Sequence, residues 1–184
     1  MRQGVGLVLA AALLGGCSSL DDDAGSGARA GSACPDDGSG YDLHAQALEC
    51  QVLELVNHVR ASGTTCSGTP RPSVPPLSMN AALRQSARSH ARDMAENNYF
   101  SHDSQDGRSF FDRISAVGYR FSNAGENIAA GSDSAEAAMQ QWLDSTAGHC
   151  ENIMSPKYVD IGVGYAANAQ SRFEHYWVQN FAAP

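Results

Sequence analysis

The first amphipathic pattern in the chain lies in DLHAQALECQVLELVNHVRASG, residues 42–63. Its apolar residues recur three or four positions apart, which is the spacing of one helix face. They are Leu48, Val52, Leu55, Val56 and Val59. Asp42 is a suitable N-cap and Gly63 a suitable stop, so the pattern predicts a helix between these two residues.

A loop and then a second helix follow. Four prolines between residues 70 and 76 exclude a helix there and predict an extended loop that ends at Leu77. Asn80 is a suitable N-cap for the next helix. The apolar face of that helix consists of Leu83, Ala87, Ala91 and Met94. His90 falls on the same packed face, so we expect a buried histidine with a hydrogen-bond partner there, not a metal ligand.

Two more helices are predicted from capping boxes, in which a capping residue is followed three positions later by an acid. Ser109 with Asp112 opens a short helix that stops at Gly118. Asp133 with Glu136 repeats the pattern before a longer amphipathic segment. The apolar face of that segment consists of Ala135, Ala138, Met139, Trp142 and Leu143.

The hydrophobic period then changes from helical to alternating. Every second residue from Val159 to Tyr165 is apolar, and residues 172–181 (RFEHYWVQNF) favour a strand on both faces. The linker ANAQS joins the two as a hairpin. A lone hairpin is only marginally stable, so we expect a third strand from Tyr119–Phe121 or from the region of Ile128. Helices packed on the faces of this sheet make a mixed α/β sandwich.

The N-terminus, MRQGVGLVLAAALLGGC, has the pattern of a secretory signal. Its apolar run is too short to span a membrane core of roughly 30 Å as a helix. The end of the run resembles a bacterial lipobox, which predicts a signal peptide over residues 1–16 and acylation of Cys17. An ordinary cleaved signal with an unused cysteine is the alternative.

Two or three acyl chains at Cys17 would hold the protein stably at a membrane. The segment 17–40 is rich in Ser, Gly, Ala and Asp and predicts a flexible, acidic tether. We therefore expect a domain over residues 41–184 that is lipid-anchored to the bacterial cell envelope, on the outer membrane where the bacterium has one.

The charge of the chain argues against one class of partner. The formal net charge is −8, and loss of Arg2 with the signal would make it −9. No basic stripe is present that could neutralise phosphates, so nucleic acid is not an expected partner.

Four cysteines remain when Cys17 is set aside. They are Cys34, Cys50, Cys66 and Cys150. An even number in an exported protein predicts two disulfides, for which three connectivities exist.

Several stretches occur in a characteristic order: ARSHARDMAENNYFSH, DGRSFFDRISAVGY, AGENIAAG, QQWLDSTAGHCENIM, IGVGYA and YWVQNF. Together, over about residues 50–181, they resemble the CAP superfamily, also called SCP-like extracellular proteins. That superfamily includes cysteine-rich secretory and pathogenesis-related proteins. The resemblance implies a three-layer α-β-α sandwich with a small central antiparallel sheet, in agreement with the α/β pattern above.

The resemblance also implies a cleft that holds two histidines and two acids. By motif position these are His102 in YFSH, Glu126 in GEN and His149 in GHC, while Ser145 stands where many members have the second acid. In many members the histidines can bind a divalent metal such as zinc, so His102 and His149 are candidate metal ligands. A hydrogen-bonded polar cluster without any cofactor is the alternative.

The stretch GHCENIM, residues 148–154, places Cys150 directly after His149. A catalytic thiolate would need protection in an oxidising compartment and a base held opposite it. We therefore expect Cys150 to form a disulfide, with Cys66 as the preferred partner and Cys34 then paired with Cys50. The stretch would be a stapled turn that presents His149.

The expected function is a tethered binding or interaction module whose cleft takes a lipid, a small molecule or a protein. One alternative is a metal-assisted hydrolase that uses His102, Glu126 and His149, and another is a structural envelope scaffold. Ser145 lacks the motif of a nucleophile elbow, and no catalytic residue is assigned.

Overall fold

Residue 34 and residues 40–184 are described by the structure, a computed structural model. The predicted signal peptide 1–16, Cys17 and nearly all of the tether 17–40 lie outside the described residues. Within them the helices are α1 (Leu43–Ser62), α2 (Ala81–Asn97), α3 (Phe110–Ala116), α4 (Ala135–Leu143) and α5 (His149–Ile153). The strands are β1 (Thr64–Cys66), β2 (Thr69–Arg71), β3 (Ser78–Met79), β4 (Asn123–Ala130), β5 (Asp160–Ala167) and β6 (His175–Ala183).

The main sheet has the strand order β3-β5-β6-β4. Strand β6 lies at its centre and pairs antiparallel with both β5 and β4. The region of Ile128 supplies the third long strand, β4, and Tyr119–Phe121 is not a strand. Strand β3 adds a two-residue parallel edge, so the sheet is antiparallel except for this short pair.

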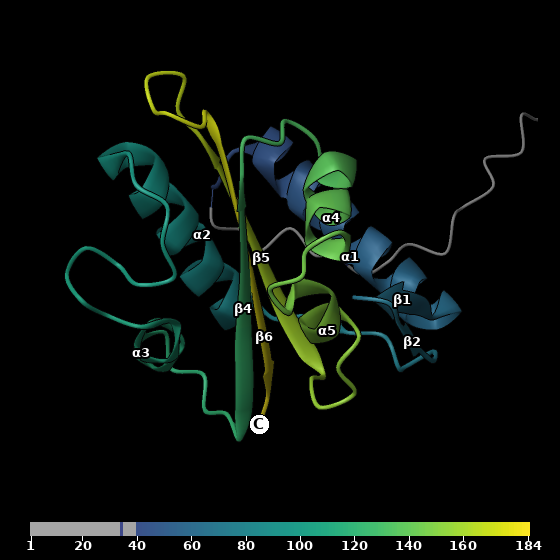
Figure 1. Ribbon diagram of the computed structural model, residues 1–184. Helices are drawn as coiled ribbons and strands as arrows, with labels where there is room; N and C mark the ends of the chain where they lie inside the picture. Colours follow the sequence, from purple (N-terminus) through teal and green to yellow (C-terminus); the bar gives the residue numbers. More distant parts are fainter. Residues whose placement is uncertain (1–33, 35–39) are drawn as a thin grey trace, which may run out of the picture. The chain divides into compact units, whose positions relative to one another are not determined.

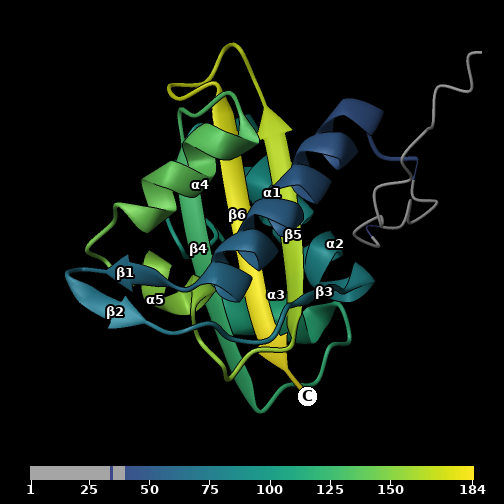
Figure 2. The same cartoon turned by 90° about the vertical axis from the view of Figure 1, so that its right-hand side faces the viewer.

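The sheet is the middle layer of three (Figure 1). Helices α2 and α3 lie on one face, and α1, α4 and α5 lie on the other. Figure 2 shows α1 and α4 crossing in front of the sheet, with α2 behind it. Buried apolar clusters fill both interfaces, and Trp142 and Trp177 are fully buried in the cluster under α1 and α4. The predicted α-β-α sandwich is confirmed.

Two glycines of IGVGYA allow α2 to lie directly on β5. A Cβ atom at Gly162 would come within 2.0 Å of the Leu83 backbone, and one at Gly164 within 2.3 Å of the Ala87 backbone. No side chain fits at either position, because real Cβ atoms do not approach backbone so closely. This contact brings the buried face of α2, with His90, against the sheet.

The predicted N-caps of the helices are confirmed, with one exception at α4. The side chains of Asp42 and Asn80 cap α1 and α2, and Ser109 forms a capping box with Asp112 at α3. The predicted cap of α4, Asp133, is wrong, because Ser134 is the N-cap and its hydroxyl accepts a bond from Ala137 N. Asp133 lies one residue before the cap position, where its carboxylate cannot complete the box with Glu136.

The predicted extended loop after α1 contains a β-hairpin that its prolines did not indicate. Its first part is the β1–β2 hairpin. Ser67 and Gly68 form the turn with φ values of 47° and 79°, the positive pair that two-residue hairpin turns require.

Both preferred disulfides are confirmed. Cys34 pairs with Cys50, and Cys66 pairs with Cys150. The second bond joins β1 to α5, so the predicted stapled turn is in fact a short stapled helix that begins at His149.

A buried ion cluster joins the two helical layers around the edge of β5. Glu49 of α1 is fully buried and lies 2.7 Å from both Arg84 and Arg88 of α2. The Glu49 carboxylate also accepts a bond from Tyr165 N, and the Tyr41 hydroxyl donates to Tyr165 O at 2.8 Å. The short strand β3 pairs with only two residues of β5. Further along that edge, the side chains of Glu49 and Tyr41 bond the backbone N–H and C=O of Tyr165, which no strand among the described residues pairs there.

Across the part of the chain that the structure describes, no helix has both the length and the apolar character needed to cross a membrane.

Candidate functional site

The GEN motif lies on β4, which forms one edge of the sheet. Neighbouring residues of a strand point to opposite faces. Glu126 therefore faces α2 and α3, where its partners lie, and Asn127 faces α5. The site is thus built on both sides of a single edge strand.

Glu126 is the centre of the first side. Its side chain is fully buried, and Oε1 lies 2.9 Å from Nδ1 of His102. Oε2 accepts a bond from Nη2 of Arg113 at 2.7 Å. The orientation of the Asn180 amide that satisfies both of its ends donates to the same Oε2 at 3.0 Å and accepts from Ser86 Oγ. A buried carboxylate with this many donors is held in one position.

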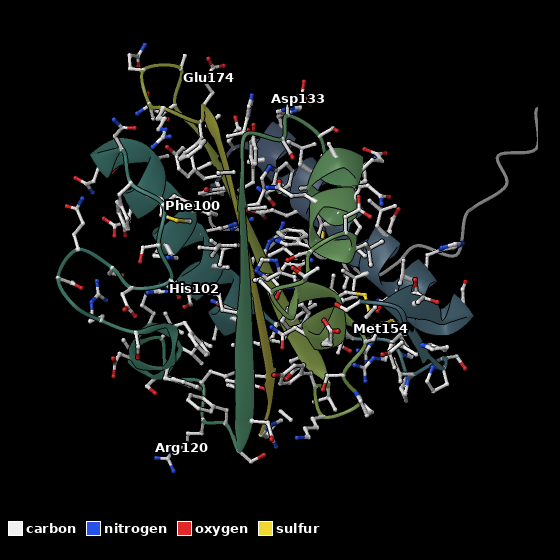
Figure 3. The ribbon with its side chains drawn as sticks, viewed as in Figure 1. Phe100, His102, Arg120, Asp133, Met154 and Glu174 are labelled. Atoms are coloured by element: carbon white, nitrogen blue, oxygen red, sulfur yellow. A yellow bond between two sulfur atoms is a disulfide. The ribbon has the colours of Figure 1, made fainter. Side chains whose placement is uncertain are left out.

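His102 is the exposed member of this cluster. It lies in the loop after α2, and about half of its side chain, 49%, is exposed. Figure 3 shows His102 on the side of β4 where α2 and α3 lie, with Phe100 labelled higher in the same view. Because a carboxylate accepts at Nδ1, the neutral ring carries its proton there and leaves Nε2 as an acceptor.

Arg113 connects Glu126 to the loop that precedes α3. Its Nη1 atom donates to Ser104 Oγ and to the Arg108 carbonyl, each at 3.1 Å. His90 lies nearby, buried, with Nε2 2.9 Å from the Ser101 carbonyl oxygen. Burial lowers the pKa of His90, and the charge of Arg113 lowers it further. His90 is therefore a neutral buried histidine with a partner, as the helix pattern predicted.

Asn127 is the centre of the second side. Its Nδ2 atom donates to the His149 carbonyl at 3.0 Å and to Gln179 Oε1 at 2.9 Å, and Asn152 donates to its Oδ1 at 2.9 Å. These bonds fix the start of α5, and the Cys66–Cys150 disulfide holds the next residue.

His149 opens α5 and is half-buried. Burial lowers its pKa, the positive charge of nearby His102 lowers it further, and Glu151 opposes both effects. The two imidazoles come from opposite sides of β4.

Ser145 is not joined to this group by any hydrogen bond within the described residues. Its hydroxyl accepts a bond from Ala147 N at 3.1 Å, which shapes the turn after α4. A serine hydroxyl that closes a local turn is a structural element.

The donor set available to a metal is small. Among the described residues, no group of three or more His, Cys, Asp and Glu side chains could hold a metal ion. Both Glu126 oxygens already accept bonds, so Glu126 acts on His102 and not as a ligand. Only the two imidazoles remain, and catalytic zinc sites use three protein ligands. A zinc centre of that kind does not fit these residues.

Comparison with known families shows to which protein family the chain belongs. Residues 53–181 match the model of the Cysteine-rich secretory protein family, CAP. The chain belongs to the CAP family. The uncharacterized protein YkwD of Bacillus subtilis (strain 168) is 35% identical to it over 135 residues, which are 73% of this chain and 47% of YkwD.

Solved structures of other proteins share this fold. An extracellular protein containing a SCP domain from Bacillus anthracis str. Ames has a TM-score of 0.63 and 31% identity, covering 76% of this chain and 41% of that chain. An outer surface protein from Borrelia burgdorferi shares the fold, with a TM-score of 0.57 and 19% identity over 74% of this chain and 90% of that chain. This chain spans less than half the length of YkwD and of the Bacillus anthracis protein.

Two residues of the Glu126 cluster were missed by sequence reasoning. Arg113 stands in a short helix where a charged residue usually faces solvent, although it is the strongest partner of Glu126. Asn180 lies in the β-prone YWVQNF stretch and pairs with Glu126 across the β4–β6 ladder. The available signal was the run of polar residues Gln179 and Asn180 between apolar neighbours, which indicates polar groups buried inside the sheet.

Proposed function

We propose that this CAP-family chain acts as an extracytoplasmic ligand-binding or interaction module, and that the surface around His102, Glu126 and His149 makes the contact. The observation that carries the proposal is the fully buried Glu126 carboxylate, which holds a half-exposed imidazole in place. Burying a charge is costly unless it is paired. The Glu126–His102 pair fixes the orientation of a ring that is half exposed, which supports a role in ligand recognition and not only in packing.

The chemistry of the surface supports binding of a polar group next to an apolar one. Because Nδ1 of His102 faces Glu126, Nε2 is the ring nitrogen left for a hydroxyl or amide of the ligand, accepting in the neutral ring and donating in the protonated one. Phe100, 42% exposed and two residues before His102 in the same loop, offers an aromatic contact. The ligand class that fits is a small molecule, a lipid headgroup or a protein segment that presents both kinds of group.

A binding role is favoured over hydrolysis. His102 pairs with a carboxylate and not with a serine or cysteine nucleophile, and the Ser145 hydroxyl closes its own turn. No cofactor is required by the proposal. Zinc, where it binds, would use Nε2 of His102 and the ring of His149, and calorimetric titration of wild type against His102→Ala tests that contact.

The two disulfides and the similarity to an extracellular protein of Bacillus anthracis support a location outside the cytoplasm. We further propose that Cys17 is acylated and tethers the domain to the cell envelope. Intact-mass measurement of the membrane-extracted protein tests this, with Cys17→Ser as the comparison. An unmodified mature mass in wild type would contradict the tether.

Native mass spectrometry of the full chain purified from its own cell envelope tests the binding role. Wild type and His58→Gln should carry the same bound species, because His58 is exposed on α1 and outside the site. His102→Gln should lose most of that species. Equal occupancy in His102→Gln, or no bound species in any of the three proteins, would contradict the proposal.

A further inference from the structure

A pocket lies next to the His102–Glu126 cluster, between α2 and α3. Its volume is about 360 Å³, within the range of small-ligand sites. On one side are residues of α2 that recur at helical spacing, among them Ser86, Ser89 and Asp93. On the other are Arg113 and Ala116 of α3. The small side chains of serine and alanine leave the space between the two helices unfilled.

The most buried ionisable residues of the lining are His90 and Arg113, with exposed fractions of 1% and 4%. Each carries a buried nitrogen without a hydrogen-bond partner among the described residues: Nδ1 of His90 and Nε of Arg113. His90 uses Nε2 for the Ser101 carbonyl oxygen, so its neutral ring donates there and Nδ1 is an acceptor. Arg113 Nε is a donor. Leaving such groups unpaired costs about 1 to 3 kcal/mol each.

One acceptor and one donor at the same pocket call for groups that can both donate and accept. A hydroxyl does both. An ionised carboxylate only accepts, and an ammonium group only donates.

The charges around the pocket argue against an anionic ligand. Arg113 is already neutralised by Glu126, and Arg108 by Asp106 at 2.7 Å. Asp93 accepts bonds from Asn97 and from the Tyr99 hydroxyl. The other charged lining residues, Arg92 and Glu96, carry opposite charges, and Ser89 offers a hydroxyl at the exposed rim.

We propose that the pocket between α2 and α3 binds a small, uncharged polyhydroxyl ligand of the sugar or sugar-alcohol class, with its hydroxyls reaching His90 and Arg113. This pocket is separate from the surface around His102, and its test does not depend on the function proposed there. Because Arg113 contacts both the pocket and Glu126, the two sites share one side chain.

Saturation-transfer NMR on the full chain tests the site. The uncharged probes are glucose, N-acetylglucosamine and ribitol, and the charged probes are glucuronate and inorganic phosphate. Ser89→Leu fills the pocket from its exposed rim, and Gln85→Leu adds the same side chain one turn earlier on α2, outside the lining. Equal melting temperatures of both variants and wild type show that the fold is retained.

At least one uncharged probe should bind wild type and Gln85→Leu with a dissociation constant of about 1 mM or tighter. Ser89→Leu should weaken that binding about tenfold or abolish it, and His102→Gln should leave it unchanged. Four results would overturn the proposal: no uncharged probe binds, only charged probes bind, Ser89→Leu binds as well as wild type, or a crystal soaked with the probe holds only water at His90 and Arg113.

Discussion

Arg113 and Glu126 form a buried ion pair, 2.7 Å between Nη2 and Oε2, that ties α3 to the edge strand β4. Their side chains are 4% and 0% exposed. Neither charge has water to stabilise it, so each depends on the other and on the hydrogen bonds around them. The same carboxylate orients His102, and the position of the exposed imidazole therefore depends on α3.

Removing one partner of this pair should cost more than removing both. Arg113→Met leaves the Glu126 carboxylate buried with the His102 imidazole and the Asn180 amide but without its cationic guanidinium, and we expect a loss of about 3 to 5 kcal/mol in the free energy of unfolding. The double variant Arg113→Met, Glu126→Leu should recover much of that loss. Denaturant unfolding at neutral pH measures both.

The exposed pair of Arg108 with Asp106 is the control for this experiment, because Arg108→Met should change stability by less than about 1 kcal/mol. A double variant as unstable as Arg113→Met would contradict the charge-burial explanation.

Gly164 should not tolerate even one added methyl group. In Gly164→Ala the new Cβ would meet the Ala87 backbone, which cannot move without shifting α2. We expect destabilisation of about 3 kcal/mol or more by thermal or chemical unfolding. Ala167→Ser, at the exposed end of the same strand, should stay within about 0.5 kcal/mol of wild type. Near-wild-type stability of Gly164→Ala would show that α2 does not pack this closely.

The two disulfides should differ in their contributions to stability. Cys66–Cys150 joins residues 84 positions apart and Cys34–Cys50 residues 16 apart. Loop closure then contributes about 4 to 5 kcal/mol for the first and about 3 for the second. Paired Cys→Ala variants, unfolded with guanidinium, measure the difference. A larger loss from the shorter loop would contradict this order.

Stability should fall as the medium becomes acidic. The pKa of His90 is lowered in the folded protein by burial and by Arg113, so the unfolded chain binds more protons once pH falls below about 6.5. The free energy of unfolding therefore decreases from about pH 7 downward until His90 protonates in the folded state as well. Melting temperatures between pH 7.5 and 5, taken at constant salt, follow this loss, and His90→Gln should show a shallower dependence. An identical pH profile for wild type and His90→Gln would exclude His90 as the source.

Local patterns predicted the helices and strands whose faces are long enough to show a period. The apolar stripes of α1 and α2 and the alternation of β5 each span several turns or residues, and the predicted burial of His90 followed from the stripe of α2. The five-residue α5 shows no period of its own. Its position depends on the disulfide and on Asn127, which lie far from it in sequence.

The polar partners of Glu126 were not predictable from local pattern. Arg113 is 13 residues away and Asn180 is 54, and only the packing of α3 and the register of β4 with β6 bring them together. The same holds for Glu49, whose carboxylate reaches two arginines of α2 around the edge of the sheet. In the sequence alone these polar and charged side chains look like surface residues, because only the tertiary fold buries them.

The central claim is that His102, Glu126 and His149 belong to one site although they come from three separate segments. NMR titration of the His149 ring in wild type and in His102→Gln tests it most directly. Removing the charge of His102 should raise the pKa of His149 toward its ordinary value, because that charge is one of the two causes that lower it. An unchanged pKa of His149 in His102→Gln would place the two imidazoles in separate environments and contradict the account.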